Sequence, residues 1–144
     1  MVELLATVCA ALFAGAAVYA NLVEHPARMT TGAAAALRQW RPSYHRATFM
    51  QASLAILGTL AGLAAWMNGA GRSWLIGAAL LGAVVPFTLI VVLPTNRRLE
   101  SLDSDADPAV VSSLLARWAQ LHAVRTLLSL AALVIFTIAL RRPH

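Results

Sequence analysis

The sequence has very little charge, a single cysteine and no lysine. Only 12% of its 144 residues are charged, whereas 60% are hydrophobic, and a soluble domain carries about 25% charged residues. A soluble fold of this composition would leave wide apolar surfaces in water, so we expect lipid to be its solvent. The lone Cys9 lies in an apolar run and has no second cysteine to pair with, so we expect a small buried side chain.

Several motifs of soluble enzymes are also missing. The chain has no Walker A loop, no Gly-x-Ser-x-Gly motif and no Cys-x-x-Cys pair, which argues against ATP hydrolysis, serine hydrolysis and thioredoxin-like exchange. Its basic residues are all arginine apart from the histidines, and the net charge is +5. Because these arginines lie between hydrophobic runs and form no continuous stripe, we expect no nucleic-acid partner.

Long apolar runs dominate the chain, and a helix needs about 20 apolar residues to cross a bilayer. They predict one all-α domain over 1–144, an integral membrane four-helix bundle with antiparallel up-down-up-down topology. Asp107-Pro108 has the form of a helix N-cap followed by proline, so the last helix should begin near 108 and project beyond the membrane. The predicted spans cover about 4–24, 46–67, 74–94 and 119–140.

Proline and glycine give expectations about helix shape. Pro86 lies inside the third run, where it removes one backbone hydrogen bond and predicts a kink. Pro26 disfavours helical geometry at His25, so we expect the first helix to end or bend there. The pair Gly58 and Gly62 has the small-xxx-small spacing that lets helix backbones approach closely.

The arginines also indicate an orientation. Seven of them belong to segments 24–46 and 95–118, and three to the opposite side of the bundle. The positive-inside rule therefore puts the two long loops, and the polar residues near them, in the cytoplasm. The replacement of lysine by arginine and the heavy use of alanine are typical of a GC-rich bacterial genome, which predicts a multi-pass protein of a bacterial cytoplasmic (inner) membrane. Since no basic residue precedes the first run, we expect a retained span rather than a cleaved signal peptide.

Polar side chains gather at one end of the predicted bundle. The end of the first helix meets the start of the second there, and the end of the third meets the start of the fourth. Trp118, His122 and Arg125 lie on one helix face by their spacing of four and three residues. The residues expected at this level are Asn21, Glu24, His25, Arg28, Trp40, Tyr44, His45, Arg46, Gln51, Asn96, Arg97, Arg98, Trp118, Gln120, His122 and Arg125.

Some of these residues allow more than one interpretation. Arg125 lies about one turn inside the expected hydrocarbon edge, where a charge either faces the bundle interior or snorkels to the surface. The tryptophans and Tyr44 are candidates for substrate contacts or for an interfacial aromatic belt. Glu24 is a metal-ligand candidate or the salt-bridge partner of Arg28.

Histidine suggests a metal as well, because neutral imidazole ligates copper, iron and haem iron. The alternative is that these histidines hydrogen-bond loop carbonyls or water. The cofactor stays unknown, with copper, iron, haem and no cofactor all open. The metal-ligand candidates are His25, His45, His122 and Glu24.

Short sequence pieces flank the predicted spans in a fixed order. They are Tyr19-Ala20-Asn21-Leu22-Val23-Glu24-His25-Pro26, Trp40-x-x-x-Tyr44, Pro94-x-Asn96-x-x-Leu99 and Arg117-Trp118-x-x-x-His122-x-x-Arg125-Thr126. In this order they resemble the anthrone oxygenase-like family of small four-span membrane proteins, long catalogued as a domain of unknown function. The resemblance covers nearly the whole chain.

The resemblance implies a membrane-embedded oxidoreductase or oxygenase that acts on a lipophilic aromatic, anthrone- or quinone-like substrate, since some fungal relatives oxidise anthrones to anthraquinones. A histidine, His122 or His25, would remove a proton, and Arg125 or Arg28 would stabilise the resulting oxyanion. The alternative is a non-catalytic membrane protein that binds a metal, haem or a partner protein. The expected partners are the lipid bilayer, a small lipophilic substrate and further copies of the chain in a homo-oligomer.

The candidate site residues combine this resemblance with the clustering at one end of the bundle. The resemblance itself carries over Asn21, His25, Pro26, Trp40, Tyr44, Asn96, Trp118, His122 and Arg125 as the shared site. The catalytic candidates are His122, Arg125, His25, Asn21 and Asn96. The substrate-binding candidates are Arg28, Trp40, Tyr44, Arg46, Gln51 and Trp118.

Overall fold

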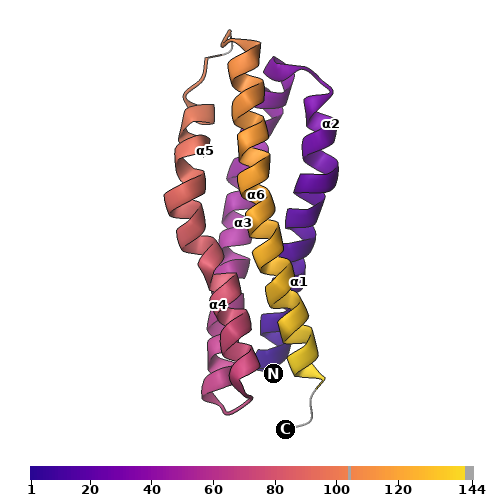
Figure 1. Ribbon diagram of the computed structural model, residues 1–144, viewed down its shortest axis with the longest axis vertical. Helices are drawn as coiled ribbons and strands as arrows, with labels where there is room; N and C mark the ends of the chain where they lie inside the picture. Colours follow the sequence, from indigo (N-terminus) through magenta and orange to yellow (C-terminus); the bar gives the residue numbers. More distant parts are fainter. Residues whose placement is uncertain (104, 142–144) are drawn as a thin grey trace.

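Helices make up the whole regular structure of the described residues, 1–103 and 105–141 of a computed structural model. Each of the helical runs is long and apolar enough to cross a membrane, and there are four within this part of the chain. Figure 1 shows them side by side in alternating direction, with the N-terminus and the end of α6 at the same end. The predicted all-α four-helix bundle is confirmed.

The helical runs have the following bounds. The first run comprises α1 (Val2–Tyr19), η1 (Ala20–Glu24) and α2 (His25–Met29), and the second is α3 (Ala33–Met67). The third comprises α4 (Arg72–Phe87), η2 (Thr88–Val92) and α5 (Leu93–Glu100), and the fourth is α6 (Pro108–Leu140). Asp107 caps α6 by accepting a hydrogen bond from the backbone N–H of Ala109.

The connections at the polar end are shorter than the sequence suggested. Only residues 30–32 separate α2 from α3, so the expected long loop over 24–46 is wrong. Alanine-rich sequence after Gly32 favours helix, and α3 therefore starts well before its apolar part. The helices thus extend past their apolar spans, and the polar residues of this end are held on helix surfaces rather than on mobile loops.

Two short π-helices, η1 and η2, interrupt the first and third runs. Each ends two residues before a proline, Pro26 in one case and Pro94 in the other. A proline ring clashes with the carbonyl four residues earlier in an α-helix, and that carbonyl belongs here to a residue inside the π-helix. The wider turn relieves the clash, so the first helix does not end at His25, whose backbone is helical (φ −66°, ψ −48°).

The helices approach one another closely toward the end opposite the polar residues. A Cβ atom added to Gly62 would lie 2.9 Å from Cζ of Phe136 and 3.1 Å from Cβ of Ala78, and one added to Gly58 would lie 2.7 Å from Leu81. Trp74 stacks on Phe136 with ring centroids 5.2 Å apart. Small residues therefore let α3 and α4 approach closely here and leave room for one large ring from α6.

A second hydrophobic cluster fixes the helices at the polar end. Trp40 and Leu37 of α3 pack there with Leu99 of α5 and with Leu115 and Trp118 of α6, and all five are buried. This cluster holds the ends of α3, α5 and α6 together beyond the expected spans. The polar residues of this end are therefore carried by helices that are packed against one another.

Candidate functional site

The polar end is organised around a hydrogen-bonded group of Asn21, His122 and Thr126. Asn21 Nδ2 donates to the carbonyl of Ala119 over 3.0 Å, and Thr126 Oγ1 donates to Asn21 Oδ1 over 2.8 Å. His122 Nδ1 lies 2.7 Å from the same Oδ1. Because the Asn21 amide nitrogen is already bonded to a carbonyl, its oxygen is the acceptor, and His122 Nδ1 must carry the proton. The Nε2 atom of a neutral His122 is then the one with the free lone pair.

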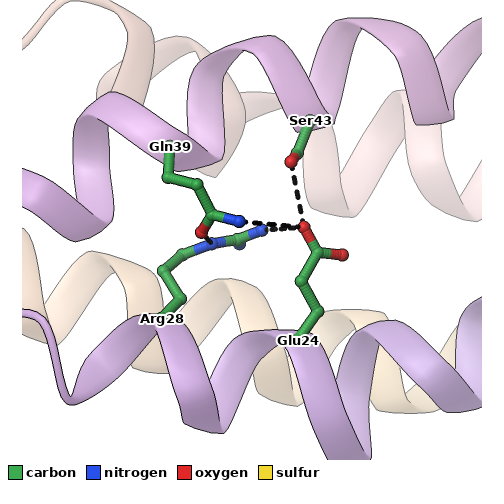
Figure 2. Close-up of polar contacts among 4 residues, drawn as sticks. All are labelled: Glu24, Arg28, Gln39 and Ser43. Atoms are coloured by element: carbon green, nitrogen blue, oxygen red, sulfur yellow. Dashed lines mark hydrogen bonds and ion pairs between the residues drawn. The ribbon is translucent and has the colours of Figure 1, made fainter.

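A second polar group surrounds Glu24, as Figure 2 shows. Its Oε1 atom accepts from Arg28 Nη2 over 2.6 Å and from Ser43 Oγ over 2.9 Å, and Gln39 Nε2 lies 3.5 Å from it. Gln39 Oε1 in turn accepts from Arg28 Nε over 2.5 Å. The predicted Glu24–Arg28 pair is thus formed, and two residues of α3 link it to the neighbouring helix.

Aromatic rings fill the space between these two groups. Trp40 and Tyr44 stack almost in parallel, with centroids 4.9 Å apart and an interplanar angle of 3°. Trp118 meets Trp40 edge to face at 6.2 Å, and its ring also lies 4.9 Å from that of His122. The Arg28 guanidinium lies 5.9 Å from the centre of the Trp118 ring, within the range of a cation–π contact.

A cavity of about 180 Å³ lies among these side chains. It combines aromatic walls with a histidine, an arginine and a carboxylate, which is the mixed lining typical of small-molecule sites. Its polar and aromatic lining residues come from three helical runs. They are Tyr19, Glu24, Arg28, Trp40, Ser43, Tyr44, Gln51, Trp118 and His122.

A second cavity, of about 110 Å³, adjoins the first through Tyr44 and Gln51, which line both. Arg125 belongs to this second cavity. Its Nη2 atom donates to Gln51 Oε1 over 2.7 Å, and its guanidinium lies 5.6 Å from the centre of the Phe13 ring. His122 and Arg125 therefore face different cavities, although they are three residues apart on α6.

Other candidates lie outside both cavities. His45 is 66% exposed and pairs with Glu100 over 3.1 Å, while Arg46 is exposed on α3. His25 is buried beside Trp118, with ring centroids 5.6 Å apart, and Asn96 is buried on α5. The first cavity is lined by neither His25 nor Asn96.

The expected metal set is not assembled by the fold. Among the described residues, no three histidine, cysteine or acidic side chains are close enough together to hold a metal ion. The physical reason is that His45 points to the exposed side of α3 and Glu24 is taken up by Arg28. The prediction of a metal site formed by His25, His45, His122 and Glu24 therefore has no support.

Sequence reasoning missed Gln39, Ser43 and Thr126 as members of the site. Gln39 and Ser43 are four residues apart on α3 and flank Trp40, so they share the helix face that meets Glu24. Thr126 lies four residues after His122 and reaches the same Asn21 oxygen. Thr126 was part of the fourth motif piece but was not assigned to the site. Gln39 and Ser43 had only a spacing signal, and short polar side chains of these types are common on helix surfaces.

Comparison with known proteins identifies a family that this chain matches. The model of the anthrone oxygenase family matches residues 40–135, a range that includes Trp40, Tyr44, Gln51, His122 and Arg125. Anthrone oxygenase tpcL of Aspergillus fumigatus is 41% identical over 71 residues, which cover 47% of this chain and 44% of that protein. No solved structure matches the chain.

A second curated relative covers a longer stretch. Anthrone oxygenase nsrD of Aspergillus novofumigatus is 36% identical over 100 residues, 63% of this chain and 62% of that protein. The chain thus spans about half the length of the curated relatives it matches. Both relatives are fungal, so the predicted bacterial inner membrane is contradicted. An arginine-rich, alanine-rich composition reflects codon usage and does not identify a kingdom. The family match extends over more than half of the chain, and the chain belongs to the anthrone oxygenase family.

Proposed function

We propose that this chain is a membrane-embedded oxygenase that oxidises a flat, lipophilic aromatic substrate of the anthrone or quinone type. Both curated relatives bear the name anthrone oxygenase. The observation that carries the proposal is the position of His122, whose ring lines an aromatic cavity while its Nδ1 atom is held by Asn21.

His122 is the proposed general base. An anthrone carries an acidic methylene carbon between two aromatic rings, and removal of one proton gives a delocalised carbanion. A neutral imidazole with Nδ1 protonated offers Nε2 as the acceptor of that proton. Asn21 acts as a positioning residue, because its hydrogen bonds fix both the ring orientation and the tautomer of His122.

Arg28 is the proposed stabiliser of the negative charge. The carbanion of an anthrone places most of its charge on the carbonyl oxygen across the central ring, and a guanidinium in a water-poor cavity stabilises such an oxyanion strongly. Arg28 lines the same cavity as His122, and its buried Nη1 atom has no hydrogen-bond partner among the described residues. Arg125 faces the adjoining cavity, so Arg28 suits this role better.

The proposed oxidation needs dioxygen as its only co-substrate. The carbanion gives its electron pair to dioxygen, a C–O bond forms, and protonation yields a hydroperoxide. Loss of water from this group breaks the O–O bond and the remaining C–H bond and leaves a carbonyl. One anthrone and one dioxygen thus give one anthraquinone and one water, and the proton taken by His122 returns to the departing oxygen.

Membrane embedding fits the same proposal. Each helical run presents large apolar side chains on the outside of the bundle, among them Leu12, Leu60, Leu89 and Leu127, all more than half exposed. Lipid covers such surfaces without cost, whereas water does not. A hydrophobic aromatic substrate concentrates in the same phase, so the protein would meet it in the membrane.

The test uses the purified full chain in detergent, with anthrone, air and a protein-free control for spontaneous oxidation. Anthraquinone absorbance and oxygen uptake should rise together in equal molar amounts. His122→Asn should lower kcat by about a hundredfold or more, as expected for loss of a general base, because the new amide keeps a donor for Asn21 but has no basic nitrogen. His45→Asn is the matched control at an exposed histidine of the same end. Full turnover by His122→Asn would overturn the assignment.

A further inference from the structure

The second cavity contains a cation, Arg125, that is not neutralised by any acidic side chain of the described residues. Arg125 hydrogen-bonds to the neutral amide of Gln51, and in the described part of the chain no carboxylate pairs with it. Its Nε atom is buried without a partner. By contrast, the Arg28 guanidinium is neutralised by Glu24. An uncompensated cation within an apolar helix bundle is costly, so this position favours an anion.

The rest of the cavity is built for an apolar body. Phe13, Ala55, Val84 and Val85 form its walls, and Gln51 and Thr88 are polar neighbours. The carboxamide of Gln51 holds one nitrogen of Arg125, which leaves the unpartnered Nε edge for a ligand. The lining therefore fits a hydrophobic molecule that carries one negatively charged group.

The size of the first cavity indicates that a three-ring substrate extends beyond it. An apolar cavity of roughly 150 Å³ holds a single benzene ring, and the first cavity has about 180 Å³. A fused three-ring molecule with its reactive carbon at His122 would extend past this volume. Tyr44 and Gln51 line both the first and the second cavity, so the second cavity offers adjoining space next to Arg125.

The position of Arg125 on α6 suits this extension. His122 and Arg125 are three residues apart, which puts their Cβ atoms about 5–6 Å from each other on one side of the helix. The second cavity is also bordered by Thr48 and Leu89, both exposed on the outer side of α3 and η2. A ligand can therefore reach Arg125 from the lipid side, between those two elements.

From this arrangement we infer that Arg125 is the binding site for an acidic substituent, a carboxylate or an ionised phenol, on the aromatic substrate. The inference rests on the proposed function for its choice of ring system. The Arg125 guanidinium would pair with the charged oxygen while the ring edge lies against Phe13 and Val84. Arg125 is thus a specificity-determining residue, whereas His122 and Arg28 act at the reacting carbon.

The experiment measures binding of two unreactive probes, anthraquinone-2-carboxylate and anthraquinone-2-carboxamide, by quenching of tryptophan fluorescence in an uncharged detergent. The probes have nearly the same size and differ in charge. The wild-type chain should bind the carboxylate about tenfold more tightly than the carboxamide, since a charge-assisted hydrogen bond contributes at least this much. Equal affinities for the two probes would overturn the inference without any variant being made.

Variants identify the residue responsible. Arg125→Gln should bring the affinity ratio of the two probes close to one, whereas Arg125→Lys should retain a preference for the carboxylate. Arg117→Gln, an exposed arginine on the same helix, should keep the wild-type ratio and controls for surface charge. An unchanged ratio in Arg125→Gln would contradict the inference. The probes cannot be oxidised by this route, so failure of anthrone turnover and failure of carboxylate binding are separate results.

Discussion

The carboxamide oxygen of Asn21 lies 2.7 Å from Nδ1 of His122 and joins the first helical run to the last. The two residues are 101 positions apart in the chain. The same oxygen also accepts from Thr126, and the amide nitrogen donates to a backbone carbonyl. One small side chain therefore both ties α6 to η1 and decides which imidazole nitrogen is free.

Replacement of Asn21 should weaken the fold and the reaction together. Asn21→Leu has a similar volume but leaves His122 Nδ1 without its partner, whereas Thr126 Oγ1 keeps the carbonyl of His122. A buried unsatisfied group costs about 1–3 kcal/mol. We expect the free energy of unfolding in detergent to fall by about 2 kcal/mol or more. kcat should fall more than KM rises, because the ring of His122 loses its orientation.

The control for this prediction is Asn68→Leu, which changes an asparagine at the opposite end of the bundle, just after α3. It should leave kcat for anthrone oxidation unchanged. Equal kcat for Asn21→Leu and the wild type would show that His122 needs no fixed tautomer.

The Glu24–Arg28 ion pair should contribute more to stability than the exposed pair between His45 and Glu100. The Arg28 side chain is only 2% exposed, so Glu24→Gln keeps an acceptor oxygen but leaves a buried cation without its counter-charge. We expect the variant to lose about 2 kcal/mol of unfolding free energy, less than for a fully buried pair because Glu24 is partly exposed. Glu100→Gln, which breaks the exposed pair with His45, should change it by less than about 1 kcal/mol.

A double variant gives the sharper test of the same pair. Arg28→Met added to Glu24→Gln removes the unpaired charge and should recover part of the lost unfolding free energy. It should not recover activity if Arg28 stabilises the oxyanion. A further loss of stability in the double variant would contradict this account.

The close helix packing at Gly77 predicts a local intolerance of side chains. A Cβ atom there would overlap the ring of Phe136, and overpacking costs about 1–3 kcal/mol. Gly77→Ala should therefore lower the free energy of unfolding, and Phe136→Leu combined with it should reverse part of the effect. Gly15→Ala is the matched control, because nothing lies within 4 Å of the new atom, and it should stabilise α1 by about 0.5–1 kcal/mol.

Tyr44 should affect substrate binding more than the chemical step. Its ring stacks on Trp40 and lines both cavities. Tyr44→Ala therefore removes an aromatic ring that would contact the proposed substrate. We expect KM for anthrone to rise about tenfold, in line with about 0.5–1.5 kcal/mol for a ring pair beyond the burial of the ring itself. Tyr44→Phe keeps the ring and should bind almost normally; a KM as high as that of the alanine variant would shift the role to the hydroxyl.

The number and direction of the helices could be predicted because they depend on the length and order of the apolar runs. Apolar runs of sufficient length indicate the helices, and alternating direction brings Asn21, Gln51 and His122 to one end. The sequence could not place individual side chains on a common wall, because that depends on how far each helix is rotated about its axis. For this reason His122 and Arg125 were expected at one site, although they line adjoining cavities.

The positions of the candidates outside both cavities depend on the same rotation. His45 follows Tyr44 directly, and one residue turns a helix by about 100°, so it lies on the exposed side of α3 beside Glu100. Asn96 is buried on α5, away from both cavities. The first helix continues past His25 because a wider turn precedes Pro26, and the sequence of η1 contains no signal for that turn.

The wide turn of η1 changes how insertions and deletions act in this protein. One extra residue per turn shifts every later side chain by about 100° relative to an uninterrupted α-helix. Glu24 and Arg28 contact Ser43 and Gln39 with that shift in place. A single deletion between Ala20 and Glu24 would remove the extra residue and turn η1 into an ordinary α-helical turn, which leaves Arg28 on the same face of the helix. An alignment gap at this place in a relative would therefore mark a helix without the wide turn, with the same residues still facing the first cavity.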